Sequence, residues 1–386
     1  MTGVIISGKT EIPVRNLWLL MLYASELYAD NPDIRGAGAE DRPDELPDLV
    51  AEVLARAVER RLQRSLSRAY VTRSQPLTRV RGRIDVIKTE SAQLLSRGQV
   101  ACRYDELVVD NPTNRLICAG LITAGTIAQD GDRAHRCRQL AGMLRLQGVT
   151  PTRVSQTNAD AITLGRNQIA DLDAVNAARL LLRMNIPNEE AGAAHRMSPR
   201  RDVADIRRLY EAAVRGFYRA TLRPPWRVHA GETKHSWPLE ERSPGAMAIL
   251  PVMRTDTILE LPDRRVIVET KFADALKPNQ YGKPKLSRNH LFQLYAYVQS
   301  QHDRDDLSAT TEGVLLYPVV NGELDEFVVI SGHRYRFVTV DLAGPATAIR
   351  DRLLSIVAGT TTHPASGLIA CGDDELTVVT QARVGD

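Results

Sequence analysis

The residues of this chain best suited to chemistry lie near position 260, where two apolar segments are bordered by acids and a lysine. Asp256 lies in the first segment, a turn follows at Pro262-Asp263, and the second segment, Val266-Ile-Val268, leads into Glu269-Thr-Lys271. This pattern predicts two strands joined as a hairpin. Because side chains alternate along a strand, Glu269 and Lys271 should point to the same side.

These residue types suit the hydrolysis of a phosphodiester. The hard oxygens of Asp256 and Glu269 are ligands that Mg²⁺ prefers, and a bound metal polarises the phosphoryl oxygen and activates a water. Lys271 can stabilise the negative charge that develops at the phosphorus or orient the attacking water. The alternative for Glu269 and Lys271 is a surface salt bridge at a strand end, which is the commoner fate of such a pair.

Two helices contribute further candidates. Gln293 and Tyr297 are four residues apart in a helix predicted over residues 288–300, so they share one face of it. Glu211 falls on a helix predicted over residues 203–222. The order Glu211, Asp256, Glu269-x-Lys271, Gln293, Tyr297 resembles that of the Q-x-x-x-Y branch of the PD-(D/E)xK nucleases. For Glu211, Gln293 and Tyr297 the alternative is a polar, solvated helix face.

The elements that must position these residues predict an α/β (α+β) fold. Helices are expected at 16–28, 49–62, 112–128, 133–146, 168–184, 203–222, 288–300 and 345–357, and strands at 70–87, 248–260, 265–271, 312–319, 326–331 and 335–341. The second half therefore reads as a central mixed sheet flanked by helices.

The chain is long enough for two domains. Its 386 residues exceed the roughly 250 at which single cores usually stop growing. Residues 185–200 carry two prolines and no clear period, which predicts a linker there. We expect a mixed helix and strand domain over 1–190 and the domain with the candidate site over 191–386.

Composition restricts the function classes. The net charge is only +3, so any nucleic-acid surface must be a local patch. Of the 50 basic residues only seven are lysines, and four of these lie at positions 271, 277, 283 and 285. In so arginine-rich a chain, Lys271 is expected to be present for its chemistry, whereas Lys277, Lys283 and Lys285 are interpreted as a solvated loop.

Metal-finger and membrane classes are disfavoured. The four cysteines form no C-x-x-C pair, and the eight histidines lack zinc-ligand spacing. The chain shows no charged and apolar leader and no run of about 18 apolar residues, which disfavours secretion and membrane spanning. A cytoplasmic protein is expected.

Motifs in the amino-terminal half indicate one particular family within these nucleases. It carries three motifs, namely Ile12-Pro-Val-Arg-Asn-Leu-Trp-Leu-Leu-Met-Leu-Tyr-Ala24, Arg81-Gly-Arg-Ile-Asp85, and Cys102-Arg-Tyr-Asp-Glu106 followed by Asp110 and Asn114-Arg115. Together with Leu209-Tyr-Glu211, Arg254-Thr-Asp256, Glu269-Thr-Lys271-Phe and Leu291-Phe-Gln293-Leu-Tyr-Ala-Tyr297, they resemble McrC, the nuclease subunit of McrBC modification-dependent restriction systems. The resemblance covers about residues 11–340.

The resemblance implies a Mg²⁺-dependent DNA endonuclease with a PD-(D/E)xK domain, in which Asp256, Glu269 and Thr270 bind the metal. It further implies that the amino-terminal domain docks onto, and stimulates, a ring of McrB-like AAA+ GTPase subunits, which bind the GTP and recognise modified cytosine in double-stranded DNA. An inactive nuclease fold that serves as an adaptor is the alternative. The chain departs from the family where Phe272-Ala-Asp replaces a second lysine, and where Glu269 replaces the usual Asp.

The motif Arg81-Gly-Arg-Ile-Asp85 has two interpretations. Gly82 can permit a bend, and Arg81 and Arg83 can pair with Asp85, Asp105 or Glu106 to fix the domain's shape. Alternatively, Arg81 or Arg83 reaches the nucleotide site of the partner, where an arginine stabilises phosphoryl-transfer charge.

Overall fold

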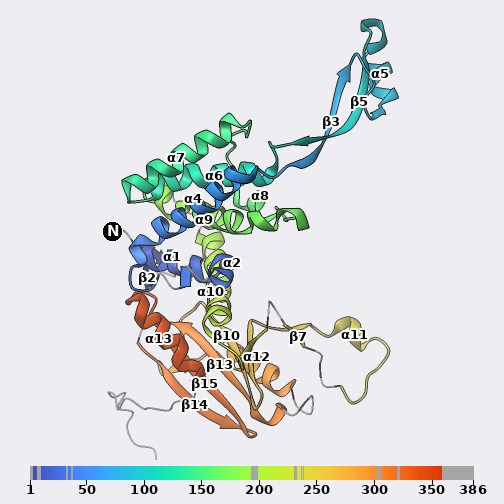
Figure 1. The fold of residues 1–386 in the computed structure, drawn as a ribbon. Coiled ribbons are helices and arrows are strands. Elements are labelled where there is room, and N and C mark those ends of the chain that lie inside the picture. The colour runs from blue at the N-terminus through green and yellow to red at the C-terminus, as the bar shows by residue number, and fades with distance from the viewer. Residues whose placement is uncertain are drawn as a thin grey trace, which may run out of the picture.

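The computed structural model describes residues 3–6, 10–31, 34–35, 38–192, 199–229, 233–235, 237, 239–301, 305, 307–319 and 322–358. Figure 1 shows three parts stacked on one another: a projecting arm at the top, a helical bundle below it, and a sheet flanked by helices at the bottom.

A six-stranded mixed sheet forms the lower part, in the order β14-β15-β13-β10-β9-β6. Its strands are β6 (Arg227–Val228), β9 (Thr257–Leu261), β10 (Arg264–Thr270), β13 (Thr311–Pro318), β14 (Asp325–Ile330) and β15 (His333–Val340). Strands β10, β13 and β15 run parallel, whereas β9 pairs antiparallel with β10 across the turn at Pro262-Asp263. The predicted mixed sheet and the predicted hairpin are both confirmed.

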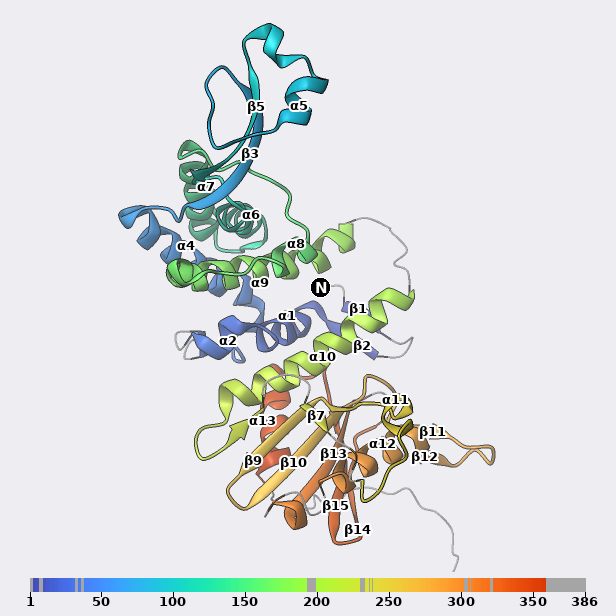
Figure 2. The same ribbon diagram turned by 90° about the vertical axis from the view of Figure 1, so that its right-hand side faces the viewer.

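Helices cover both faces of this sheet. Helices α10 (Pro199–Thr221) and α13 (Ala346–Val357) lie on one face, and α12 (Arg288–Gln299) lies on the other, as Figures 1 and 2 show. Strand β10 is buried on both faces because Val266 and Val268 join the core under α10, while Ile267 joins the core under α12. The continuous apolar run in the sequence reflects this double burial.

The helical bundle consists of α4 (Leu46–Arg64), α6 (Pro112–Ile127), α7 (Gly131–Leu146) and α9 (Leu172–Gly192). Helices α6 and α9 approach closely, since a Cβ at Gly120 would lie 2.5 Å from the Cβ of Ala178. These helices occupy the predicted positions, except that α9 continues through residues 185–192. The prediction of an irregular stretch over 185–200 is therefore wrong for 185–192 and for 199–200, where α10 begins.

Two short helices connect the bundle to the sheet. The single helix predicted over residues 16–28 is instead α1 (Val14–Tyr23) and α2 (Glu26–Asp30), because the chain leaves the helix at Ala24 and Ser25 caps the next one by accepting from the amide of Tyr28 at 3.3 Å. Figure 2 shows both helices lying between α9 and α10.

Side chains of α1 bind both halves of the chain. The Asn16 amide donates to the carbonyls of Leu342 and Gly344, at 2.8 Å each, and the Trp18 indole donates to the carbonyl of Met184 at 3.1 Å. One apolar core extends from Ile12 to α13. The division into domains over 1–190 and 191–386 stays a prediction. The motif around Asn16 has a structural role, because it joins the two halves of the chain.

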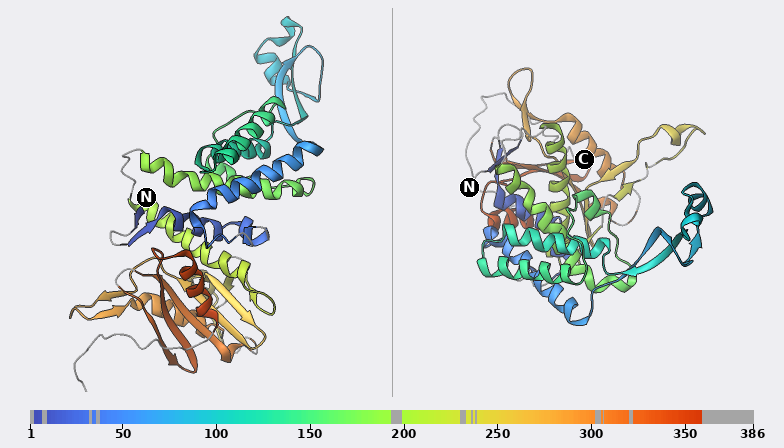
Figure 3. Two further views of the ribbon diagram at one scale, coloured as in Figure 1. Left: turned by 60° about the vertical axis from the view of Figure 1, so that its left-hand side comes forward. Right: turned by 90° about the horizontal axis from the view of Figure 1, so that it is seen from above.

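The arm is formed by β3 (Ala69–Leu77) and β5 (Val100–Val108), with β4 (Arg83–Ile84) and α5 (Val86–Ser91) at its outer end. Figure 3 shows it projecting well beyond the bundle. The strand expected as far as Ile87 ends earlier, because Asp85 accepts from the amide of Lys88 at 3.0 Å and thereby starts a helix. The predicted bend at Gly82 is confirmed: its φ is +70°, and a Cβ there would lie 2.5 Å from the carbonyl oxygen of Arg103.

Within the arm, Arg81 is held by its neighbours. Its guanidinium lies 4.1 Å from the centre of the Tyr104 ring and 3.4 Å from Glu106. Of the other predicted partners, Asp105 accepts from the Thr72 hydroxyl at 2.7 Å and Asp85 caps α5. The interpretation that these arginines pair with acids to fix the domain's shape therefore holds for Arg81. Arg83, in contrast, is exposed and lies opposite Arg103 in the strand register.

Several short elements were not predicted. They are β1 (Gly3–Ile6), β2 (Thr10–Pro13), β7 (Thr233–His235), β11 (Leu276–Pro278), β12 (Pro284–Leu286), α8 (Gln156–Asp160) and α11 (Ala246–Ile249). In contrast, β8 (Met253–Thr255) falls within the strand predicted over 248–260. Because α11 occupies 246–249, the strand predicted from 248 begins only at Met253. In the described part of the chain no helix is both long and apolar enough to cross a membrane.

Candidate active site

The site lies where β10 leaves the sheet. Pairing between β9 and β10 ends at Thr257 and Val268, so Thr270 has no backbone partner on that side. The carboxylate of Asp256 takes the place of one, because its Oδ2 accepts from the Thr270 amide at 2.8 Å and from the Thr270 hydroxyl at 2.7 Å. The pairing of β10 with β13 continues, since the Lys271 amide donates to the Leu316 carbonyl at 2.9 Å. Asp256 and Lys271 are thus fixed to the same strand end.

A chain of hydrogen bonds joins the predicted residues of β10 and α12. The Lys271 ammonium donates to Glu269 Oε1 at 2.6 Å and to Gln293 Oε1 at 2.8 Å. The Gln293 amide nitrogen in turn donates to the Tyr297 hydroxyl at 2.7 Å. Glu269 from β10 and Gln293 from α12 therefore both bind the Lys271 ammonium. Tyr297 is connected to it through Gln293.

Glu269 lies inside the protein and not on its surface. Only 2% of the residue is exposed. The salt bridge that was the alternative for Glu269 and Lys271 therefore forms, at 2.6 Å, but its predicted place on the surface is wrong. Burial, followed by the nearby charge of Asp256, raises the pKa of Glu269 to about 7, although Lys271 lowers it. Burial and a neighbouring like charge both disfavour an ionised carboxylate, which therefore requires compensation.

The donor set fits a hard divalent cation. Glu269 Oε2 is buried, and no hydrogen-bond partner reaches it within the described part of the structure. A cation bound between Asp256 and Glu269 would satisfy that oxygen and compensate both charges. No group of three His, Cys, Asp or Glu side chains in the described residues could hold a metal. Two carboxylates completed by other oxygens and water are typical of Mg²⁺ and unlike a zinc site.

The comparison with known families agrees with this geometry. The family model described as "McrBC 5-methylcytosine restriction system component" matches residues 5–318. The chain belongs to this family. The resemblance to McrC drawn from the sequence motifs is thereby confirmed.

The McrBC family member characterised as the "Type IV methyl-directed restriction enzyme EcoKMcrBC" of Escherichia coli (strain K12) is 24% identical over 355 residues, which cover 89% of this chain and 97% of that protein. Among solved structures, the half-complex from a tetradecameric assembly of Thermococcus gammatolerans McrB AAA+ hexamers with bound McrC matches with a TM-score of 0.40 at 15% identity, covering 89% of this chain and 76% of that chain. A cryo-EM structure of the Thermococcus gammatolerans McrBC complex matches with a TM-score of 0.32 at 20% identity, over 48% of this chain and 61% of that chain.

Glu211 lies on α10, the helix that packs against β10. The ring of Tyr210 contacts that of Phe272, with centroids 5.7 Å apart, which brings this turn of α10 alongside the end of β10. The Glu211 carboxylate is paired with Arg215 at 2.7 Å. Phe272, which stands next to the candidate lysine in this McrBC family member, therefore serves the packing between α10 and β10, and a catalytic role for Glu211 stays a prediction.

Two residues near the site were missed in the sequence. His290 Nδ1 lies 3.1 Å from the Tyr317 hydroxyl. The charge of Glu269 contributes, after burial, to the raised pKa of Tyr317, and the charge of Lys271 contributes, after burial, to the lowered pKa of His290. His290 is three residues before Gln293, so its position on the same helix face was available as a signal. Tyr317 carried none, because it lies in an apolar run.

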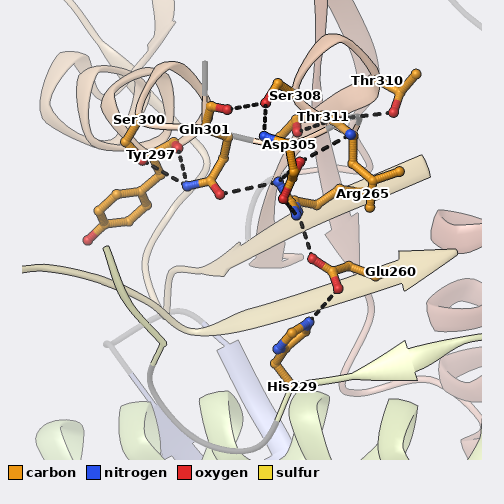
Figure 4. Close-up of polar contacts among 11 residues, drawn as sticks. His229, Glu260, Arg265, Tyr297, Ser300, Gln301, Asp305, Ser308, Thr310 and Thr311 are labelled. Atoms are coloured by element: carbon orange, nitrogen blue, oxygen red, sulfur yellow. Dashed lines mark hydrogen bonds and ion pairs between the residues drawn. The ribbon is translucent and has the colours of Figure 1, made fainter. Parts of the chain in front are cut away.

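The other end of the hairpin carries a second polar network, shown in Figure 4. Arg265 is 5% exposed and binds Glu260 at 2.7 Å and Asp305 at 2.6 Å. Glu260 also contacts His229 at 2.7 Å. Here each acid faces a basic group, so this network holds the strands together. It differs from the site around Glu269, where one oxygen of the buried acid has no partner among the described residues.

Proposed function

We propose that this chain is the DNA-cleaving subunit of an McrBC-type restriction complex and that it hydrolyses phosphodiesters with Mg²⁺. The observation that carries the proposal is the buried Glu269, which shares Lys271 with Gln293 while one of its oxygens has no partner. Such a carboxylate is costly for stability, and a metal-dependent reaction gives a reason for it.

Asp256 and Glu269 would hold the metal, with Thr270 beside them. When bound, Mg²⁺ supplies the polarisation of the phosphoryl oxygen and the activation of a water. Thr270 orients Asp256 by donating two hydrogen bonds to Oδ2, which leaves the other oxygen, Oδ1, for the cation. We propose that Thr270 is a further ligand of the metal.

Lys271 provides a positive donor next to the scissile phosphate. Its ammonium is held by Glu269 and Gln293, which use two of its three protons and aim the third away from them. A preorganised cation of this kind stabilises the charge that develops in the transition state. Gln293 is a positioning residue, because it acts on the phosphate only through Lys271.

We further propose that the amino-terminal half docks onto a ring of McrB-like AAA+ GTPase subunits and stimulates their hydrolysis of GTP. The arm is the part of this half that projects from the body, and it exposes large apolar side chains, including Tyr70 at 74%, Ile87 at 83% and Val86 at 63%. Apolar side chains on a projecting element are typical of a protein contact. Arg83, which is exposed near the outer end of the arm, is the remaining candidate for a residue that reaches the nucleotide.

The decisive experiment mixes the purified chain with the AAA+ protein encoded beside it, GTP and a DNA duplex carrying 5-methylcytosine. Cleavage is measured with Mg²⁺, with EDTA, and with each protein alone. We expect cleavage only when both proteins, GTP and Mg²⁺ are present. If GTP hydrolysis rises on mixing but no DNA is cut under any metal condition, the chain is an adaptor with an inactive nuclease fold.

Replacing Gln293 by leucine is expected to reduce the cleavage rate of the complex by about 10- to 100-fold, the usual loss when an orienting partner of a catalytic group is removed. Lys271 would keep Glu269 but lose its second acceptor. Gln299→Leu is the matched control, because Gln299 lies on the same helix and donates to another tyrosine, Tyr335, at 3.4 Å. Equal losses in the two variants would show that the helix, and not the position of Lys271, is responsible.

A further inference from the structure

The hairpin formed by β11 and β12 follows the candidate site directly and carries the lysine cluster of the sequence. Only four residues separate Lys271 from the start of β11 at Leu276. Figure 2 shows this hairpin projecting from the sheet next to α12. Lys277, Lys283 and Lys285 are all exposed on it, so three of the seven lysines of the chain lie on one small element beside the site.

The arrangement of these lysines is unfavourable for the isolated protein. Lys277 and Lys285 are direct partners in the antiparallel register, and like charges placed opposite each other destabilise a strand pair. None of the ion pairs found in the described residues involves Lys277, Lys283 or Lys285. Many arginines of the described residues, in contrast, are paired with acids, as Arg136 is with Glu52 and Glu59. Because Lys277 and Lys285 repel each other and no acid of the described residues compensates them, their arrangement indicates that they bind an anion outside the chain.

The hairpin is anchored on one face and exposed on the other. Leu276 and Leu286 are partners in the register and pack against the core under α12. Because side chains alternate along each strand, Lys277 and Lys285 project from the opposite face. The apolar pair therefore fixes the direction in which the two ammonium groups point.

The tip of the hairpin is ordered by its own hydrogen bonds. The side-chain oxygen of Asn279 accepts from the amides of Tyr281 and Lys283, at 2.9 and 3.0 Å, and Gly282 takes a φ of +74° that other residues rarely adopt. This loop holds Tyr281 outward with 77% of the residue exposed. A large aromatic side chain presented in this way on a soluble protein is typical of a contact residue.

We propose that the β11–β12 hairpin binds the DNA duplex beside the cleavage site, with Lys277, Lys283 and Lys285 on backbone phosphates and Tyr281 in a groove. The inference rests on the proposed function and adds to it the element that presents the phosphodiester to Lys271. The small net charge of the chain makes such a local patch necessary for DNA binding.

The test measures DNA binding apart from cleavage. The full-length chain carrying Glu269→Gln is titrated with a labelled 40-base-pair duplex at several KCl concentrations, with and without the combined changes Lys277→Gln, Lys283→Gln and Lys285→Gln. Each lost phosphate contact should reduce the slope of log K against log salt by about 0.9, so we expect a reduction of about 2 to 3 and a weakening of about 10- to 100-fold at low salt. Tyr281→Ala should weaken binding by about 10-fold and leave the slope unchanged, because a groove contact releases no counterions.

The control variant removes the same charge elsewhere, with Lys88→Gln, Arg97→Gln and Arg145→Gln on exposed positions of the arm and the bundle. It should leave the slope nearly unchanged. The hairpin variant should melt no lower than its parent, because the repulsion between Lys277 and Lys285 is removed. Equal slopes for the hairpin variant and its parent would overturn the proposal, as would equal losses in the hairpin and control variants.

The outcomes also separate this proposal from the proposed function. If the hairpin variant alone loses DNA binding while the wild-type complex never cuts DNA, the hairpin proposal stands and the nuclease proposal fails. If the complex cuts DNA but the hairpin variant binds and cuts like the parent, the nuclease proposal stands and the hairpin proposal fails.

Discussion

Replacing Glu269 by glutamine is expected to abolish DNA cleavage by the complex, by at least about 10³-fold, and at the same time to raise the melting temperature of the free chain at pH 8. The loss of cleavage follows because a neutral amide is a poor ligand for Mg²⁺, whose contribution to charge stabilisation is worth several kcal/mol. The gain in stability follows because glutamine keeps the shape of the side chain and an oxygen for Lys271 but removes a buried charge.

The pH dependence of this gain has a definite sign. The pKa of Glu269 is raised to about 7, above its ordinary value near 4.5, so the folded protein binds the proton more tightly than the unfolded chain. The wild type therefore has its full stability at low pH and loses stability as the pH rises from about 4.5 to 7. Since one pKa unit corresponds to about 1.4 kcal/mol, the loss above pH 7 is on the order of 3 kcal/mol. Glutamine avoids this loss.

Melting curves in EDTA at pH 5 and pH 8 measure the difference between the variant and the wild type. We expect nearly equal melting temperatures at pH 5 and a variant higher by several degrees at pH 8. Mg²⁺ should then raise the melting temperature of the wild type and leave that of the variant unchanged, because binding to the folded state alone stabilises it. A variant that melts lower at pH 8 in EDTA would mean that Glu269 is needed to hold Lys271 in the fold.

Glu260→Gln is the matched control on the neighbouring strand. Burial opposes the ionisation of Glu260, but hydrogen bonds from His229 and Arg265 outweigh it, so the pKa of Glu260 is lowered. Its removal would leave the buried Arg265 with fewer acceptors (Figure 4) and should lower the melting temperature at pH 8. The same substitution is thus expected to have opposite effects at two positions of one hairpin.

Much of the candidate site was predictable because its geometry is local. The spacing of Glu269 and Lys271 on a strand, and that of Gln293 and Tyr297 on a helix, each fix a shared face before the fold is known. The contact between the two elements was not available from spacing, since α12 meets β10 only through the packing of the sheet. The resemblance to a known family supplied that part, and the hydrogen bonds of Lys271 to Glu269 and Gln293 agree with it.

The errors in the fold have local causes of their own. A single residue, Ser25, divides the predicted first helix by capping the next one, and Asp85 in the same way converts an expected strand into α5. Helix α9 continues through Pro187 to Gly192, although proline usually ends a helix. Periodicity reports which face is buried, but it does not report where a short polar side chain starts a new element.

The junction between the two halves of the chain depends on Gly216, and replacing this residue by alanine is expected to destabilise the protein strongly. A Cβ at Gly216 would lie 1.9 Å from the carbonyl oxygen of Tyr23, so α1 and α10 would have to separate. The contact is with backbone and cannot be relieved by a rotamer change. The same surface holds the Tyr23 ring against that of Phe217, with centroids 5.1 Å apart, inside the core that connects α1 to the sheet.

We expect Gly216→Ala to cost about 3 kcal/mol or more, at the upper end of the range for overpacked cores, and to lower the melting temperature by on the order of 5–10 °C. Gly142→Ala is the control: Gly142 lies within α7, nothing lies within 4 Å of its would-be Cβ, and alanine there should be neutral or stabilising by up to about 1 kcal/mol. Both variants make the same change in a helix, so intrinsic helix preference alone would stabilise both. Equal melting temperatures for the two would therefore refute the close contact between α1 and α10.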